Sequence, residues 1–157
     1  MPRKLKNQEL NRLSVENYRK VSKSPLILVL DNIRSMHNVG AIFRTADAFR
    51  VDKIYLCGIT ATPPHRDIRK TALGAEEAVD WEYVESTQDA LKKVENADIY
   101  ALEQAEETVE LRQVKLDKTK TQVLILGNEV DGVQQELLDF CKEVIEIPQF
   151  GTKHSFN

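Results

Sequence analysis

One arginine lies among small and apolar neighbours, where a charged side chain needs a reason. In the stretch NVGAIFRTADAF, Arg44 follows Asn38 by six residues. Its guanidinium is either paired with a carboxylate, for which Asp47 is well placed, or held for a substrate. Asn38 could cap a helix over the following residues, whose first amides, near Gly40, would then be free to hold an anion or a polar ligand. These residues alone leave both roles for Arg44 open.

A second stretch that could do chemistry is LILGNEVDGV, where an apolar run ends in Gly127, Asn128 and Glu129. Glycine at a strand end lets a ligand approach the backbone, and Glu129 could bind a partner rich in hydrogen-bond donors. The alternative is an ordinary strand-to-helix turn with Asp131 as the helix cap. The stretch lacks the glycine spacing of the known phosphate-binding loops, so a dehydrogenase-like nucleotide-binding domain is disfavoured.

The third stretch is the terminal IPQFGTKHSFN. Pro148 fixes the exit from a strand, Gly151 allows a turn, and Ser155 and Asn157 supply a hydroxyl and an amide. The alternative interpretation is a frayed terminus.

Short apolar runs alternate with amphipathic segments, which predicts an α/β fold with a mostly parallel sheet and helices on both faces. Such sheets bind ligands beyond the carboxyl ends of their strands, where the three stretches lie. We expect strands at 26–31, 53–57, 81–85, 98–103, 122–127 and 143–147. We expect helices at 7–21, 39–49, within 69–79, at 87–96 and at 133–141, with Ser86 capping the fourth.

Charge is divided unevenly along the chain. Residues 1–70 hold 14 Lys and Arg against 6 Asp and Glu, and the remaining residues hold 8 against 19. This predicts either a local anion-binding face, with RNA as a candidate, or simply an uneven solvated surface. Cys57 and Cys141 lack a nearby partner, and the three histidines lack ligand spacing, so we expect reduced thiols and no metal. We see no signal peptide or membrane span, and predict a cytoplasmic protein.

Taken in order, the three stretches resemble the three motifs of the SpoU (TrmH-like) branch of the SPOUT RNA methyltransferases. NVGAIFRTA resembles the first motif, LGNE through Gly132 and Val133 the second, and IP, Gly151 and SFN the start of the third. KTALGAE resembles the segment that connects the motifs in this family. Each motif alone is permissive, but three in order are specific. The resemblance covers residues 25 to 157, preceded by a basic N-terminal helix over residues 1–24.

The resemblance implies transfer of a methyl group from S-adenosylmethionine to a ribose 2′-hydroxyl of tRNA or rRNA. Arg44 matches the catalytic arginine, which the family's accounts often treat as a general base. Because arginine stays charged in proteins, stabilising the developing alkoxide is the easier role. The matching polar residues around it are Asn38, Glu129, Ser155 and Asn157. The positions implied for the cofactor are Leu102, Glu103, Leu126, Gly127, Asn128, Ile147 and Phe156.

The resemblance also implies a homodimer in which the arginine and the cofactor face each other across a two-fold axis. The basic first half of the chain would supply phosphate contacts, which raise affinity without choosing a sequence. The residues predicted to make them are Lys20, Lys23, Arg34, Arg66, Arg69 and Lys70.

Family members continue past the final asparagine into a helix that completes a trefoil knot. We therefore expect the ending at Asn157 to be a truncation, with the knot helix missing from this chain. A non-catalytic RNA-binding or assembly protein that keeps the fold is the alternative function, and the intact polar residues of the motifs argue against it.

Overall fold

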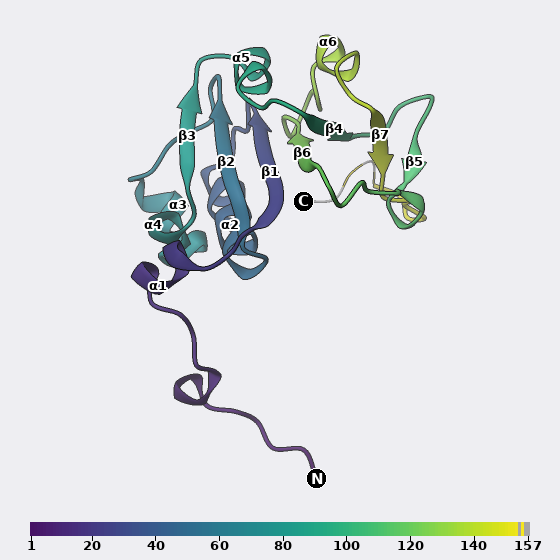
Figure 1. The fold of residues 1–157 in the computed structure, drawn as a ribbon. Helices are drawn as coiled ribbons and strands as arrows, with labels where there is room; N and C mark the ends of the chain where they lie inside the picture. Colours follow the sequence, from purple (N-terminus) through teal and green to yellow (C-terminus); the bar gives the residue numbers. More distant parts are fainter. Residues whose placement is uncertain (154, 156–157) are drawn as a thin grey trace.

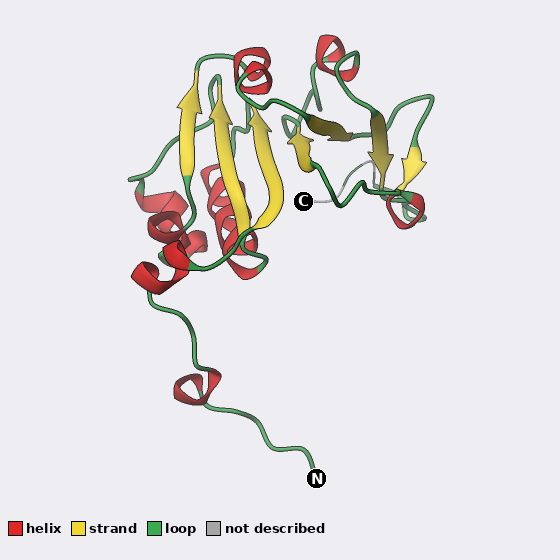
Figure 2. Cartoon of the chain, viewed as in Figure 1, coloured by secondary structure: helices red, strands yellow, loops and turns green. Residues whose placement is uncertain are grey.

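The computed structural model describes residues 1–153 and residue 155, and a single sheet runs through it (Figure 1). Figure 2 shows helices on either side of the strands. The strand order among the described residues is β3-β2-β1-β6-β4-β7-β5, and every pairing is parallel. The strands are β1 (Ser24–Asp31), β2 (Val51–Cys57), β3 (Trp81–Val84), β4 (Ala97–Leu102), β5 (Val109–Glu110), β6 (Thr121–Leu126) and β7 (Glu143–Glu146).

All six expected strands are present, and the predicted α/β fold with a parallel sheet is confirmed. The short β5 was not predicted, because two residues carry no apolar run. The helices are η1 (Asn7–Leu10), α1 (Val15–Lys20), α2 (Met36–Ala48), α3 (Arg66–Ala72), α4 (Ala75–Ala78), α5 (Thr87–Lys92), η2 (Leu111–Gln113) and α6 (Gln135–Leu138).

Both faces of the sheet are covered, because successive side chains of a strand point to opposite faces. Leu30 of β1 lies in one buried cluster with Phe43 of α2. Val29, its neighbour in the chain, lies in the other cluster with Leu91 of α5 and Leu137 of α6. The uninterrupted apolar run of β1 therefore serves two separate cores, as the sequence predicted.

The prediction of one helix over residues 7–21 was wrong. The structure has η1 and α1 instead, with Asn11 between them in the left-handed region at φ 47° and Ser14 capping α1. Leu10 and Leu13 are exposed, and Tyr18 is the buried residue of α1. A short helix needs packing to be stable, and the first part of the expected apolar stripe, Leu10 and Leu13, finds no cover here. The chain before α1 extends away from the sheet in Figure 1.

Two further local predictions need correction. α2 begins at Met36 with Ser35 as its cap, so Asn38 lies inside the first turn and does not cap the helix. The helix expected at 133–141 is confined to α6, and its N-cap position is Gln134, not Asp131. In contrast, Ser86 caps α5 as predicted, accepting from the amide of Asp89.

α2 is held against α3 by a close approach at Gly40. A Cβ built at this position would lie 2.1 Å from Thr71 Oγ1 and 2.2 Å from the carbonyl oxygen of Ile68. The Thr71 hydroxyl also donates a 2.8 Å hydrogen bond to the carbonyl of His37. The position of α3 therefore depends on the missing side chain at Gly40.

We expect Gly40→Ala to destabilise the protein by about 2 kcal/mol or more, because the added methyl group meets backbone that cannot move aside. Gly151→Ala is the matched control, since no atom of the described residues lies within 4 Å of a Cβ there. Urea unfolding followed by circular dichroism measures both. Equal stability of the two variants would contradict the close approach.

Candidate functional site

The first two motifs meet at the carboxylate of Glu129. Its Oε2 accepts a 2.8 Å hydrogen bond from the amide of Arg34, and its Oε1 accepts a 2.9 Å bond from the amide of Ser35. The side-chain amide of Asn38 donates to the same Oε1 at 3.0 Å. These partners lie 91 to 95 residues from Glu129 in the chain. The loop after β6 is thus fastened to the residues that lead into α2 and to its first turn.

Two opposing effects act on the pKa of Glu129. Partial burial raises it, but the hydrogen bonds from the Arg34 and Ser35 amides and from Asn38 outweigh burial, and the pKa is lowered. Free amides at the start of a helix also favour a negative charge. Glu129 is therefore a carboxylate at neutral pH, and its charge is part of the contact.

Asn128 and two glycines shape the loop that presents Glu129. Asn128 exchanges two backbone hydrogen bonds with Gly132, and its side chain donates a 2.7 Å bond to the carbonyl of Asn32. A Cβ at Gly127 would lie 2.2 Å from the Val133 nitrogen, and Gly132 has φ +70°. The glycine at the strand end is needed for the loop's own backbone. The sequence had suggested ligand approach as its reason.

Asp31 is a buried carboxylate that the sequence reasoning missed. It ends β1 with no exposed surface and accepts hydrogen bonds from the Thr87 hydroxyl at 2.6 Å and the Gln134 side chain at 2.8 Å. It joins β1 to the start of α5 and to the residue before α6, and it lines a cavity of about 260 Å³ with Asn128. Burial, with the nearby charge of Asp31, raises the pKa of the Cys57 thiol to about 11, although a hydrogen bond with Thr87 opposes this. In the sequence, this residue could have been noticed as the single acidic residue at the end of an apolar strand.

Arg44 lies on the exposed surface of α2, nearly two turns beyond Asn38. Within residues 1–153 and 155, its guanidinium makes no hydrogen bond or ion pair. The structural pairing with Asp47 that the sequence left open is therefore not found there. The side chain is available to a ligand or to another chain.

The residues predicted to hold a cofactor end three neighbouring strands. Leu102 of β4 pairs with Leu126 of β6 on one side and with Ile145 of β7 on the other, two residues before Ile147. Leu102, Leu126 and Ile147 are half-buried, and Ile145 is buried. Glu103 accepts 2.8 Å and 2.7 Å hydrogen bonds from the amides of Val133 and Gln104, so it also supports the loop after β6.

The residues predicted to bind RNA fall into two groups. Among the described residues, the exposed guanidinium of Arg66 has no partner, and the guanidinium of Arg34 has only a 3.7 Å contact with Asp131. The others are engaged within the chain: Lys20 with Glu16, Lys23 with the ring and carbonyl of Tyr18, Arg69 with Glu77 and Lys70 with Asp67. Exposed ion pairs such as these exchange readily with a phosphate, but Lys23 is partly buried.

The third motif is only partly described. Ile147 and Pro148 are half-buried and Ser155 is exposed, whereas the predicted Phe156 and Asn157 lie outside the described residues. The part of the chain that the structure describes contains no cluster of His, Cys, Asp and Glu able to hold a metal ion. None of its helices is long and apolar enough to cross a membrane.

Comparison with known families decides the relationship. The SpoU rRNA Methylase family matches residues 25–157. The chain belongs to this family. The SpoU chain is 30% identical over 151 residues to the 23S rRNA (guanosine-2'-O-)-methyltransferase RlmB of Vibrio parahaemolyticus. That alignment covers 96% of the chain and 60% of the Vibrio protein, so the chain spans less than two thirds of this relative's length.

Two solved structures share the fold of this SpoU chain. The A. aeolicus TrmH/SpoU tRNA modifying enzyme matches with a TM-score of 0.77 and 30% identity, covering 91% of this chain and 74% of that one. The AdoMet bound rRNA methyltransferase from Sinorhizobium meliloti matches with a TM-score of 0.78 and 28% identity, covering 89% of this chain and 54% of that one.

The lowered pKa of Glu129 gives a prediction about acid stability. A carboxylate whose pKa is lower in the folded state than in the unfolded state contributes stability above the unfolded pKa, and this contribution is lost as the pH falls through the folded pKa. We therefore expect wild type to be more stable than Glu129→Gln at neutral pH, with the difference shrinking under strongly acidic conditions. Urea unfolding across this pH range measures it. A difference that does not depend on pH would contradict a role for the charge.

Proposed function

We propose that the chain is the catalytic part of an S-adenosylmethionine-dependent RNA methyltransferase that methylates a ribose 2′-hydroxyl in tRNA or rRNA. The observation that carries the proposal is the contact of Glu129 with the start of α2. It brings the second family motif against the first, so that Arg44 extends from a helix anchored at the same sheet edge as the predicted cofactor residues. Membership in the SpoU family and the names of the relatives support the same reaction.

The residues at the strand ends fit the proposed cofactor. Leu102, Leu126 and Ile147 offer half-buried apolar surface beside backbone at adjacent strand ends, as sites for small ligands commonly do. Each oxygen of Glu103 accepts one amide and keeps a second lone pair for a ligand hydroxyl. When bound, S-adenosylmethionine supplies a methyl group on a sulfonium and so provides the electrophile. The protein's part is to orient the cofactor and the ribose.

Arg44 stabilises the negative charge that develops on the ribose 2′-oxygen as the hydroxyl loses its proton, and it contacts the neighbouring phosphate. Asn38 and Glu129 position it by fixing the start of its helix. Ser155 and Asn157 position the ribose from the third motif. Holding the cation in place beforehand is what makes such stabilisation effective, because no reorganisation is then needed during the reaction.

A homodimer completes the proposed site. Among the described residues, Arg44 makes no hydrogen bond or ion pair with the strand-end residues, although both belong to the proposed machinery. In a two-fold dimer, Arg44 of one chain faces the cofactor residues of the other. Its exposed guanidinium on α2 is consistent with this arrangement.

We expect Arg44→Ala to reduce kcat for methyl transfer by about 100-fold or more, because it removes a charge that acts in the transition state. Arg44→Lys should recover part of the rate, since it keeps the charge but loses the planar fork. Transfer of labelled methyl groups to total tRNA and rRNA, followed by nucleoside mass spectrometry, measures both rate and product.

Arg112→Ala, a change at an exposed arginine on η2, is the control and should leave the rate unchanged. A base-methylated nucleoside would refute the ribose assignment. A wild-type rate in Arg44→Ala would refute the role of Arg44.

A further inference from the structure

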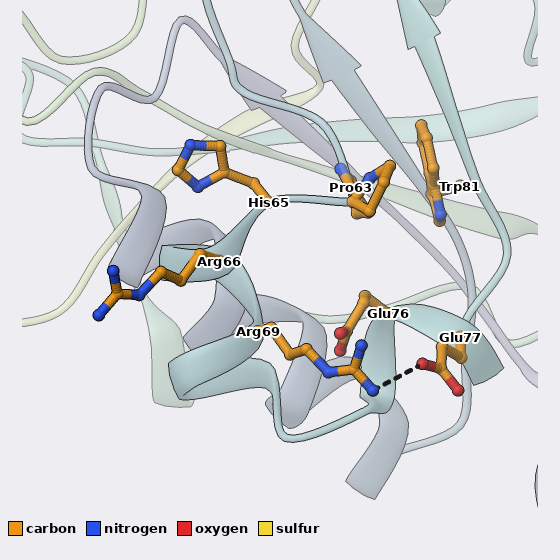
Figure 3. A pocket seen from close by; sticks show the side chains of 8 residues that line it. Pro63, His65, Arg66, Arg69, Glu76, Glu77 and Trp81 are labelled. Atoms are coloured by element: carbon orange, nitrogen blue, oxygen red, sulfur yellow. Dashed lines mark hydrogen bonds and ion pairs between the residues drawn. The ribbon is translucent and has the colours of Figure 1, made fainter.

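A second cavity lies away from the strand-end residues. It has a volume of about 410 Å³ and lies between the loop after β2, α3, α4 and the start of β3 (Figure 3). Trp81 and Pro63 stand side by side on one wall in Figure 3, and α3 with Arg66 and Arg69 forms the opposite side. The volume lies within the range of roughly 300–1,000 Å³ typical of small-ligand sites.

The indole of Trp81 supplies a flat apolar wall. Trp81 is the first residue of β3, the edge strand, and it packs only partly against the core cluster that contains Phe43. Trp81 is half-buried, so part of its ring remains open to the cavity beside Pro63. An exposed aromatic face in a cavity is a stacking surface for a flat ligand.

The polar groups of the cavity are both anionic and cationic. Glu76 accepts a 3.0 Å hydrogen bond from the amide of Gly74 with one oxygen, and its other oxygen has no partner among the described residues. Glu77 pairs with Arg69 at 3.3 Å, the dashed contact in Figure 3. Arg66 is exposed at the rim without a partner in the described chain. The cavity therefore offers hydrogen-bond acceptors inside and a free cation at its edge.

We propose that this cavity binds an unpaired nucleobase of the RNA substrate. The base stacks on Trp81, its donor edge reaches the carboxylate of Glu76, and the adjoining phosphate contacts Arg66. A carboxylate accepts best from two adjacent donors, and guanine presents N1–H and N2–H₂ side by side, whereas uracil presents one N–H. Guanine is therefore the favoured base. This inference rests on the proposed function, because it takes RNA as the substrate.

The location of the cavity explains how it serves the reaction. Arg66 and Arg69 lie on α3, and α3 packs on α2 at Gly40, where there is no room for a side chain. α2 carries Arg44. A nucleotide held against α3 is consequently fixed relative to Arg44 through the contact of α3 with α2. The number of nucleotides between the bound base and the target would then decide which ribose reaches Arg44.

Fluorescence of the protein itself tests the proposal, because Trp81 is the single tryptophan of the chain. We expect the single-stranded RNA 5′-UUGUU-3′ to quench it saturably and to bind at least about 5-fold more tightly than 5′-UUUUU-3′. Arg66→Ala and Glu76→Gln should each weaken UUGUU binding about 10-fold. Arg112→Ala should change nothing. GMP alone should bind more weakly than UUGUU if the phosphates on both sides contribute, which distinguishes an RNA site from a free-nucleotide site.

Methyl transfer gives the second measurement. Trp81→Leu should raise the KM for RNA about 10-fold with kcat within about 2-fold, and Trp81→Phe, which keeps a ring and guards against misfolding, should restore most of the affinity. If UUGUU fails to quench Trp81 while wild type methylates RNA, the inference is wrong and the proposed function stands. An equal response to a strand with an abasic central position would also overturn it. Quenching without any methyl transfer would support the cavity and refute the proposed activity.

Discussion

The carboxylate of Glu129 is the interaction on which the candidate site depends. It accepts hydrogen bonds from the backbone amides of Arg34 and Ser35, the two residues that precede α2. It also accepts a hydrogen bond from the side chain of Asn38. A single side chain thereby sets the position of the loop after β6 relative to the helix that carries Arg44. Both amide donors belong to the backbone, and the acceptor carries charge, so these hydrogen bonds are stronger than neutral ones.

Close backbone approaches at two glycines fix the neighbouring elements against the loop after β6 and against α2. Gly127 lets the loop fold back on Val133, and Gly40 lets α3 lie directly on α2. Asp31 adds a buried acceptor that joins β1 to α5 and to the start of α6. Each of these contacts leaves little freedom, which is what a site needs to hold a charge near a reacting oxygen.

The fold was largely predictable because it follows from local patterns. The apolar runs of β1 and β6 marked buried strands, and their alternation with helices gave the parallel sheet. The prediction of one helix over 7–21 was wrong because Leu10 and Leu13, the first part of its stripe, lack a surface to pack on. The resemblance grouped Glu129 with Asn38 around Arg44, but its bonds to the amides of Arg34 and Ser35 were beyond reach, since nothing local to either partner signals them. Ligand approach at Gly127 stays a prediction, and the structure adds a second reason for the glycine, the close approach of Val133. Trp81 was taken only as part of a strand, because neighbours in space, not in sequence, give its role.

The most direct test of the central claim is a double-mutant cycle between Glu129→Gln and Arg44→Ala, scored by kcat for RNA methylation. If Glu129 acts by positioning Arg44, the change at Glu129 should lower kcat in wild type but have little further effect once Arg44 is alanine. Losses that multiply, as they do for independent sites, would contradict the account.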